Sequence, residues 1–531
     1  MEGAPASTLQ TLAGDAHRQL TGLLHTLEQA DIASTLRSVP PGRRPSAENL
    51  LRYVHLRRHD LRELQKLLAQ LGLSSLGRLE PAVHDTLARV THAAARLLDP
   101  PAAGPDYTPR HPTLPEGRAL LDRNTDALLG PRPHARAVRV MLTMPTQAAD
   151  DPAFLVDALE RGLDAVRINT AHDTPEHWNR FLEHLRAAER STSHSARVFV
   201  DLAGPKIRTA SIVRDARPKK KARLHVGDTL TLHARDPAPD TPPTGTHVWT
   251  DAPEAIARLR PGDAVCFDDG KITTTVLETR PGAFDLRVTR AKPDGQNLRT
   301  ARGVNLPGVD TGLPVLTDSD LRALDALAPH ADAFCCSFIR TPDDVHTLLD
   351  AIRTRTRRPV GVVVKIETRQ GFQNIAGILL ALLHAPGAGV MIARGDLAVE
   401  VGFARLAEVQ EEILWLAEAA HMPVIWATEV LSALAKTGLP ARAEVTDAAM
   451  AQRAECVMLN KGPHILEALS HLTDILERMQ GHQRKKMATL RPLAIASIEA
   501  RLAQAGPHPA AQNQKPDHHA LDPQIQQTPA N

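Results

Sequence analysis

The stretch Val360-Gly-Val-Val-Val-Lys365-Ile-Glu367-Thr-Arg-Gln-Gly371 decides the fold of this chain. Its β-branched residues predict a fully buried strand, and Pro359 suits the position just before a strand. Side chains two residues apart in a strand lie on one face, so Lys365 and Glu367 project into the same space at the carboxyl end. Taken alone, this pattern fits a salt bridge as well as it fits an active site.

Two further apolar runs also end in charged or hydroxyl side chains, at Arg394–Asp396 and at Thr428–Glu429. Helical segments separate these runs, and an α/β barrel builds its active site from such strand ends. About eight strands of this kind can be counted, which is the number that a closed (β/α)₈ TIM barrel requires. They are expected at 138–143, 165–169, 197–202, 333–337, 360–366, 389–393, 424–428 and 455–459.

Changes in pattern divide the chain into regions. Leucines recur at helical spacing near the amino terminus, and short strands between 213 and 299 are split by Pro, Gly and Asp. Beyond about 488 the composition is rich in Pro, Gln, His and Ala. We predict an N-terminal helical region at 1–105, a linker at 106–136, the barrel at 137–212 and 300–485, an inserted all-β domain at 213–299, and a disordered tail at 486–531.

Composition narrows the functional classes. The formal net charge is only +2, which gives no overall field for nucleic acid or a membrane surface. We see neither a long apolar run nor a secretory signal. The four cysteines lie in apolar runs without metal-ligand spacing, so we interpret them as buried thiols. Together these features predict a cytoplasmic protein that does not bind nucleic acid or membranes.

The predicted strand ends gather groups of opposite charge. The cations are Arg167, Arg208 and Lys365, the anions are Asp201, Glu367 and Asp396, and the neutral polar groups are Asn169, Ser337 and Thr428. Glu367 and Asp396 end neighbouring strands, which suits a Mg²⁺ ion that takes one or two carboxylates. Arginines suit phosphate or carboxylate. These residues alone predict a Mg²⁺-assisted enzyme that acts on a small anionic molecule.

Seven motifs, in order, resemble the pyruvate kinase family over roughly 137–480. They are Arg167–His172, Asp201–Thr209, Asp268–Gly270, Gly303–Gly308, Ser337–Arg340, Lys365–Glu367 and Ala393–Leu397. The resemblance implies transfer of a phosphoryl group from phosphoenolpyruvate to ADP, giving pyruvate and ATP in glycolysis. It also implies that the inserted β domain is a mobile lid that closes over the nucleotide.

The resemblance implies a role for each matching residue. Lys365 would stabilise the enolate, Arg167 would bind the transferring phosphate, and Glu367 and Asp396 would hold Mg²⁺ or Mn²⁺. Ser337, Gly395, Asp396 and Thr428 would join Arg167 and Lys365 in the substrate site. Thr428 and the backbone near Gly395 would hold the substrate carboxylate or take part in enolate protonation. Asn169, His172, Arg208 and Arg302 would face the nucleotide phosphates.

The sequence departs from the family at its K⁺ site. Asn169 and Asp201 persist as a remnant, but Ala171 and Leu202 replace the usual Ser and Thr, and Lys206 stands where Glu is usual. A fixed ammonium can supply the charge that a bound K⁺ would supply, so we predict activity without added K⁺. Further departures are the short Thr143-Met-Pro145 loop, Glu429 in place of Gln, and Asn460-Lys461-Gly462 in place of Ser-Gly-Glu.

The regions outside the barrel also depart from the family. Only a tail follows the eighth barrel unit, so we expect the C-terminal regulatory domain to be missing and do not assume the usual tetramer. The N-terminal helical region has no counterpart in the common enzyme, and we expect it to cap the barrel or to mediate self-association as a homo-oligomer.

Two other functions compete with phosphoryl transfer. A Mg²⁺-dependent lyase that acts on a 2-oxo acid would share the enolate and the metal carboxylates. A catalytically weak regulatory paralogue would share the fold. The lid and Lys365 favour the kinase, and a binding module would not need the set Arg167, Lys365, Glu367, Asp396 and Thr428.

Overall fold

We analysed a computed structural model of the protein, which describes residues 6–98, 107, 109, 111–215, 217–234, 244–485 and 487–488. The expected disordered tail therefore lies almost entirely outside the described residues. The described residues up to 488 form one compact unit. Within the described residues, no helix is both long and apolar enough to span a membrane.

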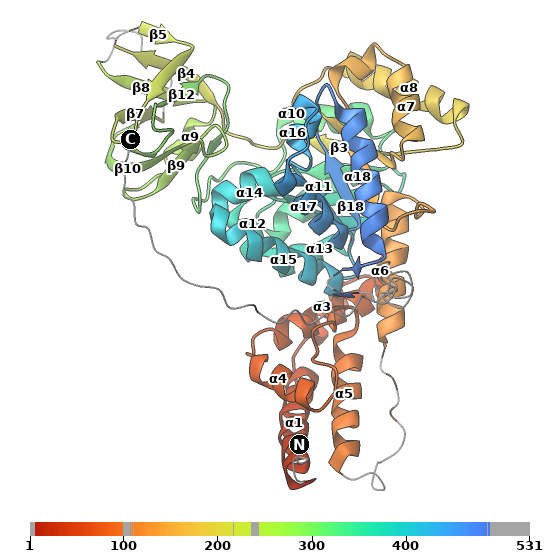
Figure 1. The fold of residues 1–531 in the computed structure, drawn as a ribbon. Coiled ribbons are helices and arrows are strands. Elements are labelled where there is room, and N and C mark those ends of the chain that lie inside the picture. The colour runs from red at the N-terminus through yellow and green to blue at the C-terminus, as the bar shows by residue number, and fades with distance from the viewer. Residues whose placement is uncertain are drawn as a thin grey trace, which may run out of the picture. The chain divides into compact units, whose positions relative to one another are not determined.

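Eight parallel strands close into a barrel, which confirms the predicted fold class (Figure 1). Their burial is nearly complete, because helices cover the outside while side chains fill the inside. In barrel order they are β1 (Arg139–Thr143), β2 (Ala165–Asn169), β3 (Arg197–Leu202), β14 (Ala333–Cys336), β15 (Gly361–Ile366), β16 (Ala388–Ala393), β17 (Val424–Ala427) and β18 (Cys456–Leu459).

Helices follow most of these strands, as the alternating pattern predicted. The main ones are α7 (Ala153–Glu160), α8 (Pro175–Ser191), α10 (Asp318–Leu327), α11 (Pro342–Arg353), α13 (Ile375–Leu382), α15 (Phe403–Ala419), α17 (Arg442–Met450) and α18 (Ile465–Gln480). Three shorter helices, α12 (Arg369–Gln373), α14 (Arg394–Val401) and α16 (Ser432–Thr437), lie close to strand ends. Helix α14 begins directly after β16, so it places Asp396 in its first turn.

The predicted linker at 106–136 was wrong in part, because it contains helix α6 (Leu114–Leu129). Thr113 and Glu116 form a capping box at its start, which stabilises the first turn. Leu128 and Leu129 pack with the residues that fill the barrel interior. A Cβ atom on Gly361 would lie 2.5 Å from Leu128 Cδ1, so this glycine makes room for the helix. Helix α6 therefore closes the amino-terminal end of the barrel.

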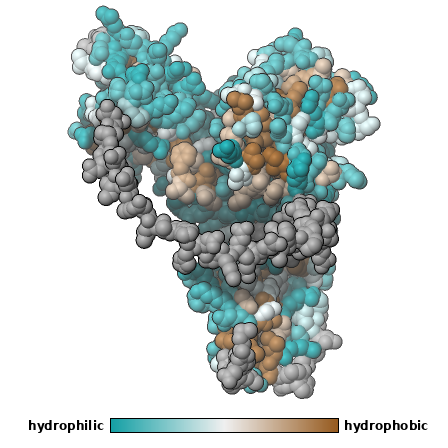
Figure 2. All heavy atoms as spheres, in the orientation of Figure 1, coloured by the Kyte–Doolittle hydropathy of each residue, from teal (hydrophilic) through white to brown (hydrophobic). Residues whose placement is uncertain are grey.

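The inserted domain is all-β, as expected, and has its own apolar core. Its main sheet has the order β13-β9-β10-β11-β7-β8-β4-β5 and starts earlier and ends later than the predicted 213–299. Its surface is mainly hydrophilic in Figure 2. The strands are β4 (Thr209–Arg214), β5 (Arg217–Lys219), β6 (Lys221–Leu224), β7 (Thr229–His233), β8 (Thr246–Thr250), β9 (Ala264–Phe267), β10 (Ile272–Arg280), β11 (Ala283–Arg290), β12 (Gln296–Arg299) and β13 (Val304–Asn305), with the short helix α9 (Pro253–Ile256) between β8 and β9.

The N-terminal region is helical, as the leucine spacing predicted. Its helices are α1 (Ala6–Glu28), α2 (Ala33–Ser38), α3 (Arg44–Leu56), α4 (Arg62–Gln70) and α5 (Val83–Leu98). Asn49 on α3 donates hydrogen bonds to the carbonyls of Glu80 and Ala419, at 2.6 and 2.9 Å. His421, just after α15, lies 2.9 Å from both the Ser46 hydroxyl and the Pro81 carbonyl. The helical region is thus fastened to the barrel through buried polar groups.

Candidate active site

A buried ion-pair network lies at the carboxyl ends of β2, β3 and β15. Arg167 donates from Nε to Asp201 Oδ2 at 2.6 Å and from Nη1 to the Thr143 hydroxyl at 2.8 Å. Lys365 Nζ lies 3.4 Å from Asp201 Oδ1. Asp201 is 1% exposed, and it holds both cations at once. Three residues that the sequence assigned to one site are therefore brought together.

Lys365 joins this network to Glu367. Its ammonium lies 3.0 Å from Glu367 Oε1 and donates to the Ser337 hydroxyl at 2.8 Å. The other Glu367 oxygen accepts a 2.8 Å hydrogen bond from the Phe338 amide. Phe338 has a φ of 57°, a left-handed backbone that is costly for an aromatic residue and common at functional sites. The structure thus fixes both carboxylate oxygens of Glu367.

Burial and charge act against each other in this network. Burial lowers the pKa of Lys365, but the Asp201 and Glu367 carboxylates outweigh burial and raise that pKa above its usual value. Burial raises the pKa of Asp201, but Arg167 and Lys365 reverse this effect and lower it. The pKa of Glu367 is raised, first by burial, while Lys365 opposes and the nearby Asp396 reinforces the shift. Lys365 is therefore a fixed cation, and Glu367 needs further positive charge nearby.

Asp396 lies at the end of the neighbouring strand and is held by two residues. Lys206 Nζ is 3.0 Å from Asp396 Oδ1, and Asn305 Nδ2 donates to the same oxygen at 3.2 Å. Lys206 comes from the connection to the inserted domain, and Asn305 from β13 within it. Lys206 also lies 3.8 Å from Asp269. These contacts join the barrel mouth to the base of the inserted domain.

The loop after β17 places Thr428 beside the first turn of α14. Its hydroxyl oxygen accepts a 3.0 Å hydrogen bond from the Gly395 amide. Thr428, Glu429 and Leu431 have φ values of 66°, 62° and 47°. Such left-handed conformations in non-glycine residues cost about 1–3 kcal/mol each and occur mainly at functional sites. Arg394 supports this loop by donating to the Thr428 carbonyl and by pairing with Asp447.

The four residues expected to face a nucleotide are less tightly connected. Asn169 Oδ1 accepts a 3.1 Å hydrogen bond from the Ala171 amide. The Arg208 amide donates to Asp251 at 2.7 Å. Arg302 is exposed and lies 3.9 Å from Asp268, and His172 is exposed. Across the described residues, no hydrogen bond or ion pair links this set to Lys365, Glu367 or Asp396.

Comparison with known proteins decides the family. The family model described as "Pyruvate kinase, barrel domain" matches residues 135–463. The chain belongs to the pyruvate kinase family. It is 31% identical over 353 residues to a pyruvate kinase of Methylorubrum extorquens, covering 65% of this chain and 69% of the relative. A pyruvate kinase of Aeropyrum pernix is 31% identical over 348 residues, with 65% and 70% covered. One from Thermotoga maritima is 29% identical over 354 residues, with 65% and 71% covered.

Three residues of this pyruvate kinase family member were named in the sequence without a role in the candidate site, yet the structure gives each a contact there. Thr143 orients Arg167, Asn305 holds Asp396, and Arg394 supports the Thr428 loop. Asn305 belonged to a motif that we quoted, but its partner became visible only when the inserted domain met the barrel. The end of β1 and the charged residue after β16 were signals that could have identified Thr143 and Arg394.

The carboxylates at the mouth fit a divalent metal ion. Asn305 Oδ1 is a buried acceptor without a hydrogen-bond partner in the described part of the chain, and it belongs to the amide that bonds Asp396. The Glu367 pKa is raised partly because Asp396 places a second negative charge nearby. Oxygen ligands of this kind, from two carboxylates and an amide, are those that Mg²⁺ and Mn²⁺ prefer. No cluster of three or more His, Cys, Asp or Glu residues with metal-binding geometry occurs in the residues described.

Proposed function

We propose that this chain is a pyruvate kinase that transfers the phosphoryl group of phosphoenolpyruvate to ADP. The observation that supports this most strongly is the position of Lys365. Its ammonium lies between Asp201 and Glu367 at the mouth of a barrel whose next strand end carries Asp396. A fixed cation at that point is suited to an enolate oxygen, where negative charge develops only as the phosphoryl group leaves.

Each residue of the network has a part in this reaction. Arg167 binds the phosphoryl group that moves, and Asp201 and Thr143 hold its guanidinium in place. The bond between the enolic oxygen and phosphorus breaks as a terminal ADP oxygen bonds to phosphorus. Lys365 then stabilises the enolate until its carbon is protonated. Thr428 lies beside Gly395, where it can orient the substrate carboxylate or take part in that proton transfer.

A divalent ion belongs to this proposal as Mg²⁺ or Mn²⁺. Glu367 and Asp396 would hold it, with Asn305 beside them. When bound, it would neutralise negative charge on the phosphate and carboxylate oxygens of the substrate. The nucleotide would lie toward Asn169, His172, Arg208 and Arg302, under the inserted domain.

We also propose that the enzyme works without K⁺. Lys206 does not pair with Asp201 or Asn169 in the described residues; its ammonium lies against Asp396 instead. A permanent positive charge is thereby present beside the substrate site, where it can take over the electrostatic role of a monovalent ion. The proposed reaction would give the enzyme a place in glycolysis. A cytoplasmic location completes the proposal, and the four buried cysteines, which form no disulfide, support that location.

A coupled assay of pyruvate formation tests the proposal. The wild type should form pyruvate from phosphoenolpyruvate and ADP with Mg²⁺, and adding K⁺ should change the rate little. Lys365→Met should lower kcat by about 10³-fold, because the developing enolate loses its cation. Lys271→Met, at a half-exposed lysine of the inserted domain, is the matched control. Unchanged turnover in Lys365→Met would contradict the role of Lys365 at the enolate. A rate that depends strongly on K⁺ would contradict the proposal that the enzyme works without K⁺.

A further inference from the structure

A second pocket lies at the opposite end of the barrel from the candidate active site. It has a volume of about 280 Å³. Its walls come from the loop before α5, from α6, from the starts of β1 and β18, and from the strand β19 (Gln483–Arg484). Such a junction of several elements is where small-molecule sites are commonly found. None of the residues proposed for catalysis lines it.

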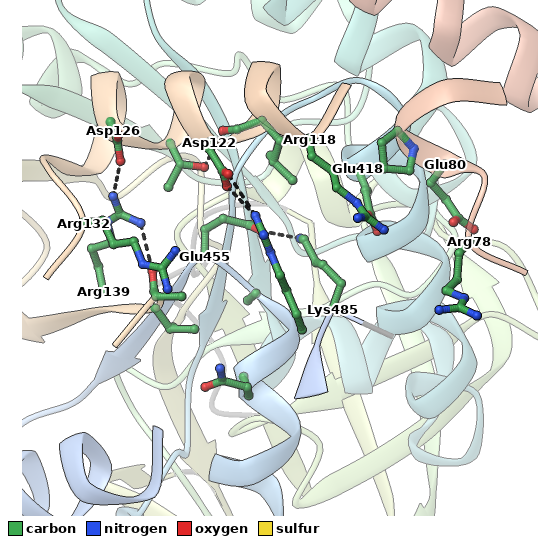
Figure 3. A pocket seen from close by; sticks show the side chains of 18 residues that line it. Arg78, Glu80, Arg118, Asp122, Asp126, Arg132, Arg139, Glu418, Glu455 and Lys485 are labelled. Carbon is green, nitrogen blue, oxygen red and sulfur yellow. Dashed lines mark hydrogen bonds and ion pairs between the residues drawn. The ribbon is translucent and has the colours of Figure 1, made fainter. Parts of the chain in front are cut away.

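Charged side chains dominate this pocket (Figure 3). Six cationic and five acidic side chains line it, which leaves one positive charge in excess. Three ion pairs, Arg139–Asp126, Arg484–Asp122 and Lys485–Glu455, account for half of the cations. Arg78 and Arg132 are exposed, and the described residues offer neither of them an ion pair. They lie at different sides of the pocket in Figure 3.

Two buried side chains in the pocket wall have unsatisfied polar atoms. Arg139 is 4% exposed, and its Nε donor has no hydrogen-bond partner among the described residues. Gln452 is 5% exposed, and its Oε1 acceptor likewise has none there. Leaving such a group unpaired costs about 1–3 kcal/mol, so native proteins rarely do so without a reason. Arg139 Nε calls for an acceptor and Gln452 Oε1 for a donor, so the pocket wall presents two different unmet hydrogen-bonding groups.

We propose that this pocket binds a small organic anion that also carries hydroxyl groups. A phosphate or carboxylate group would pair with Arg78 or Arg132 and accept from Arg139, since guanidinium groups suit both kinds of anion. A hydroxyl group would donate to Gln452. The site joins the N-terminal helical region and α6 to the barrel, so a bound ligand would tie these parts together.

Calorimetric titration of the full chain tests the proposal. The probes are glycerol 3-phosphate and glycerate, which distinguish a phosphate from a carboxylate, with uncharged glycerol as the control ligand. At least one of the two anions should bind saturably, and glycerol should not. Arg78→Ala with Arg132→Ala should weaken Kd about tenfold or more, since whichever of the two guanidinium groups pairs with the anion is removed. Arg357→Ala, at an exposed arginine that does not line the pocket, should leave Kd unchanged.

Three results would overturn the proposal. The first is that neither anion binds saturably. The second is that the double variant binds as tightly as the wild type. The third is that Arg167→Met abolishes binding while the double variant keeps it. The last result would place the anion at the barrel mouth. Inorganic phosphate tests the role of Gln452 separately: it should bind more weakly than glycerol 3-phosphate, and Gln452→Leu should remove that difference. A difference that persists in Gln452→Leu would exclude the hydroxyl contact.

Discussion

The two ends of the barrel use buried polar groups in different ways. At the carboxyl ends of the strands, the buried groups are charged, and Asp201 alone faces two cations. At the amino-terminal ends, the N-terminal helices attach through the buried neutral groups of Ser46, Asn49 and His421, although Arg139 and Lys485 form ion pairs elsewhere at that end. Burying charged groups, as at the mouth, costs free energy and is expected where a reaction needs them. Burying neutral groups that satisfy one another's hydrogen bonds, as at the attachment, costs little and is enough to hold two parts together.

Backbone conformation shows the same contrast. Four non-glycine residues that follow strands at the mouth, Phe338, Thr428, Glu429 and Leu431, adopt left-handed conformations. The Phe338 amide donates to Glu367, and the Thr428 hydroxyl accepts from the Gly395 amide, so two of the four contact groups of the candidate active site. His421 is the one residue among those named at the attachment that shares this conformation, with a φ of 51°. Leu76 and Lys485 are also left-handed, so what distinguishes the mouth is that three such residues lie close together in one loop, at Thr428, Glu429 and Leu431.

The largest stability difference should arise from Asp201. Asp201→Asn leaves the buried cations Arg167 and Lys365 without their shared anion, which should cost about 3–5 kcal/mol. Asp150→Asn breaks an exposed pair with Arg180 and should cost less than about 1 kcal/mol. Urea unfolding at pH 7 measures both. If both variants lost the same small amount of unfolding free energy, the buried cations Arg167 and Lys365 would not depend on Asp201 for their charge compensation.

A smaller effect should come from Glu400 on α14. Burial, its main cause, raises the pKa of this carboxyl to about 7. The folded state therefore holds a proton that the unfolded state releases near pH 4.5, so stability should fall as pH rises from 5 to 8. The loss should be about 2.5 kcal/mol. Glu400→Gln should remove this loss, while Glu278→Gln, at an exposed glutamate, should retain it. Parallel curves of unfolding free energy against pH for the two variants would contradict the assignment.

The smallest of these effects should appear at the attachment and run in the opposite direction. Burial lowers the pKa of His421 to about 4, so the folded state resists the proton that the unfolded state binds near pH 6.5. Stability should fall by about 2 kcal/mol as pH drops from 7 to 5. His421→Gln should lose less over that interval. We would abandon the attachment role if the variant and the wild type showed the same dependence on pH.

The sequence predicted those features that depend on local pattern. β-branched runs located the eight barrel strands, and the residues at their ends led us to predict that Arg167, Asp201, Lys365, Glu367 and Asp396 lie at one mouth, where the structure has them. The parallel strands of a closed barrel all end at one mouth. Residues that follow successive strands in the sequence therefore lie close together in space.

The sequence could not predict contacts that join distant segments. The run of Pro, Ala and Gly at 100–105 suggested that a linker follows, whereas residues 114–129 form helix α6. Leu128 and Leu129 of this helix pack against the barrel interior, a contact that the local sequence does not reveal. Lys206 was expected to replace K⁺ beside Asn169 and Asp201, whereas the structure pairs it with Asp396. That pair depends on how the inserted domain meets the barrel, which no local pattern encodes. The second pocket likewise requires residues from 78 to 485.

In the proposed mechanism, Glu367 and Asp396 hold one divalent ion beside Lys365. Electron paramagnetic resonance of Mn²⁺, titrated with the full chain, tests this most directly. The wild type should bind one Mn²⁺ at this site, and Glu367→Gln and Asp396→Asn should each weaken that binding by tenfold or more, since each removes a charged ligand. Glu429→Gln, which changes a neighbouring carboxylate outside the pair, should leave it unchanged. Unaltered Mn²⁺ binding in both ligand variants would contradict the account.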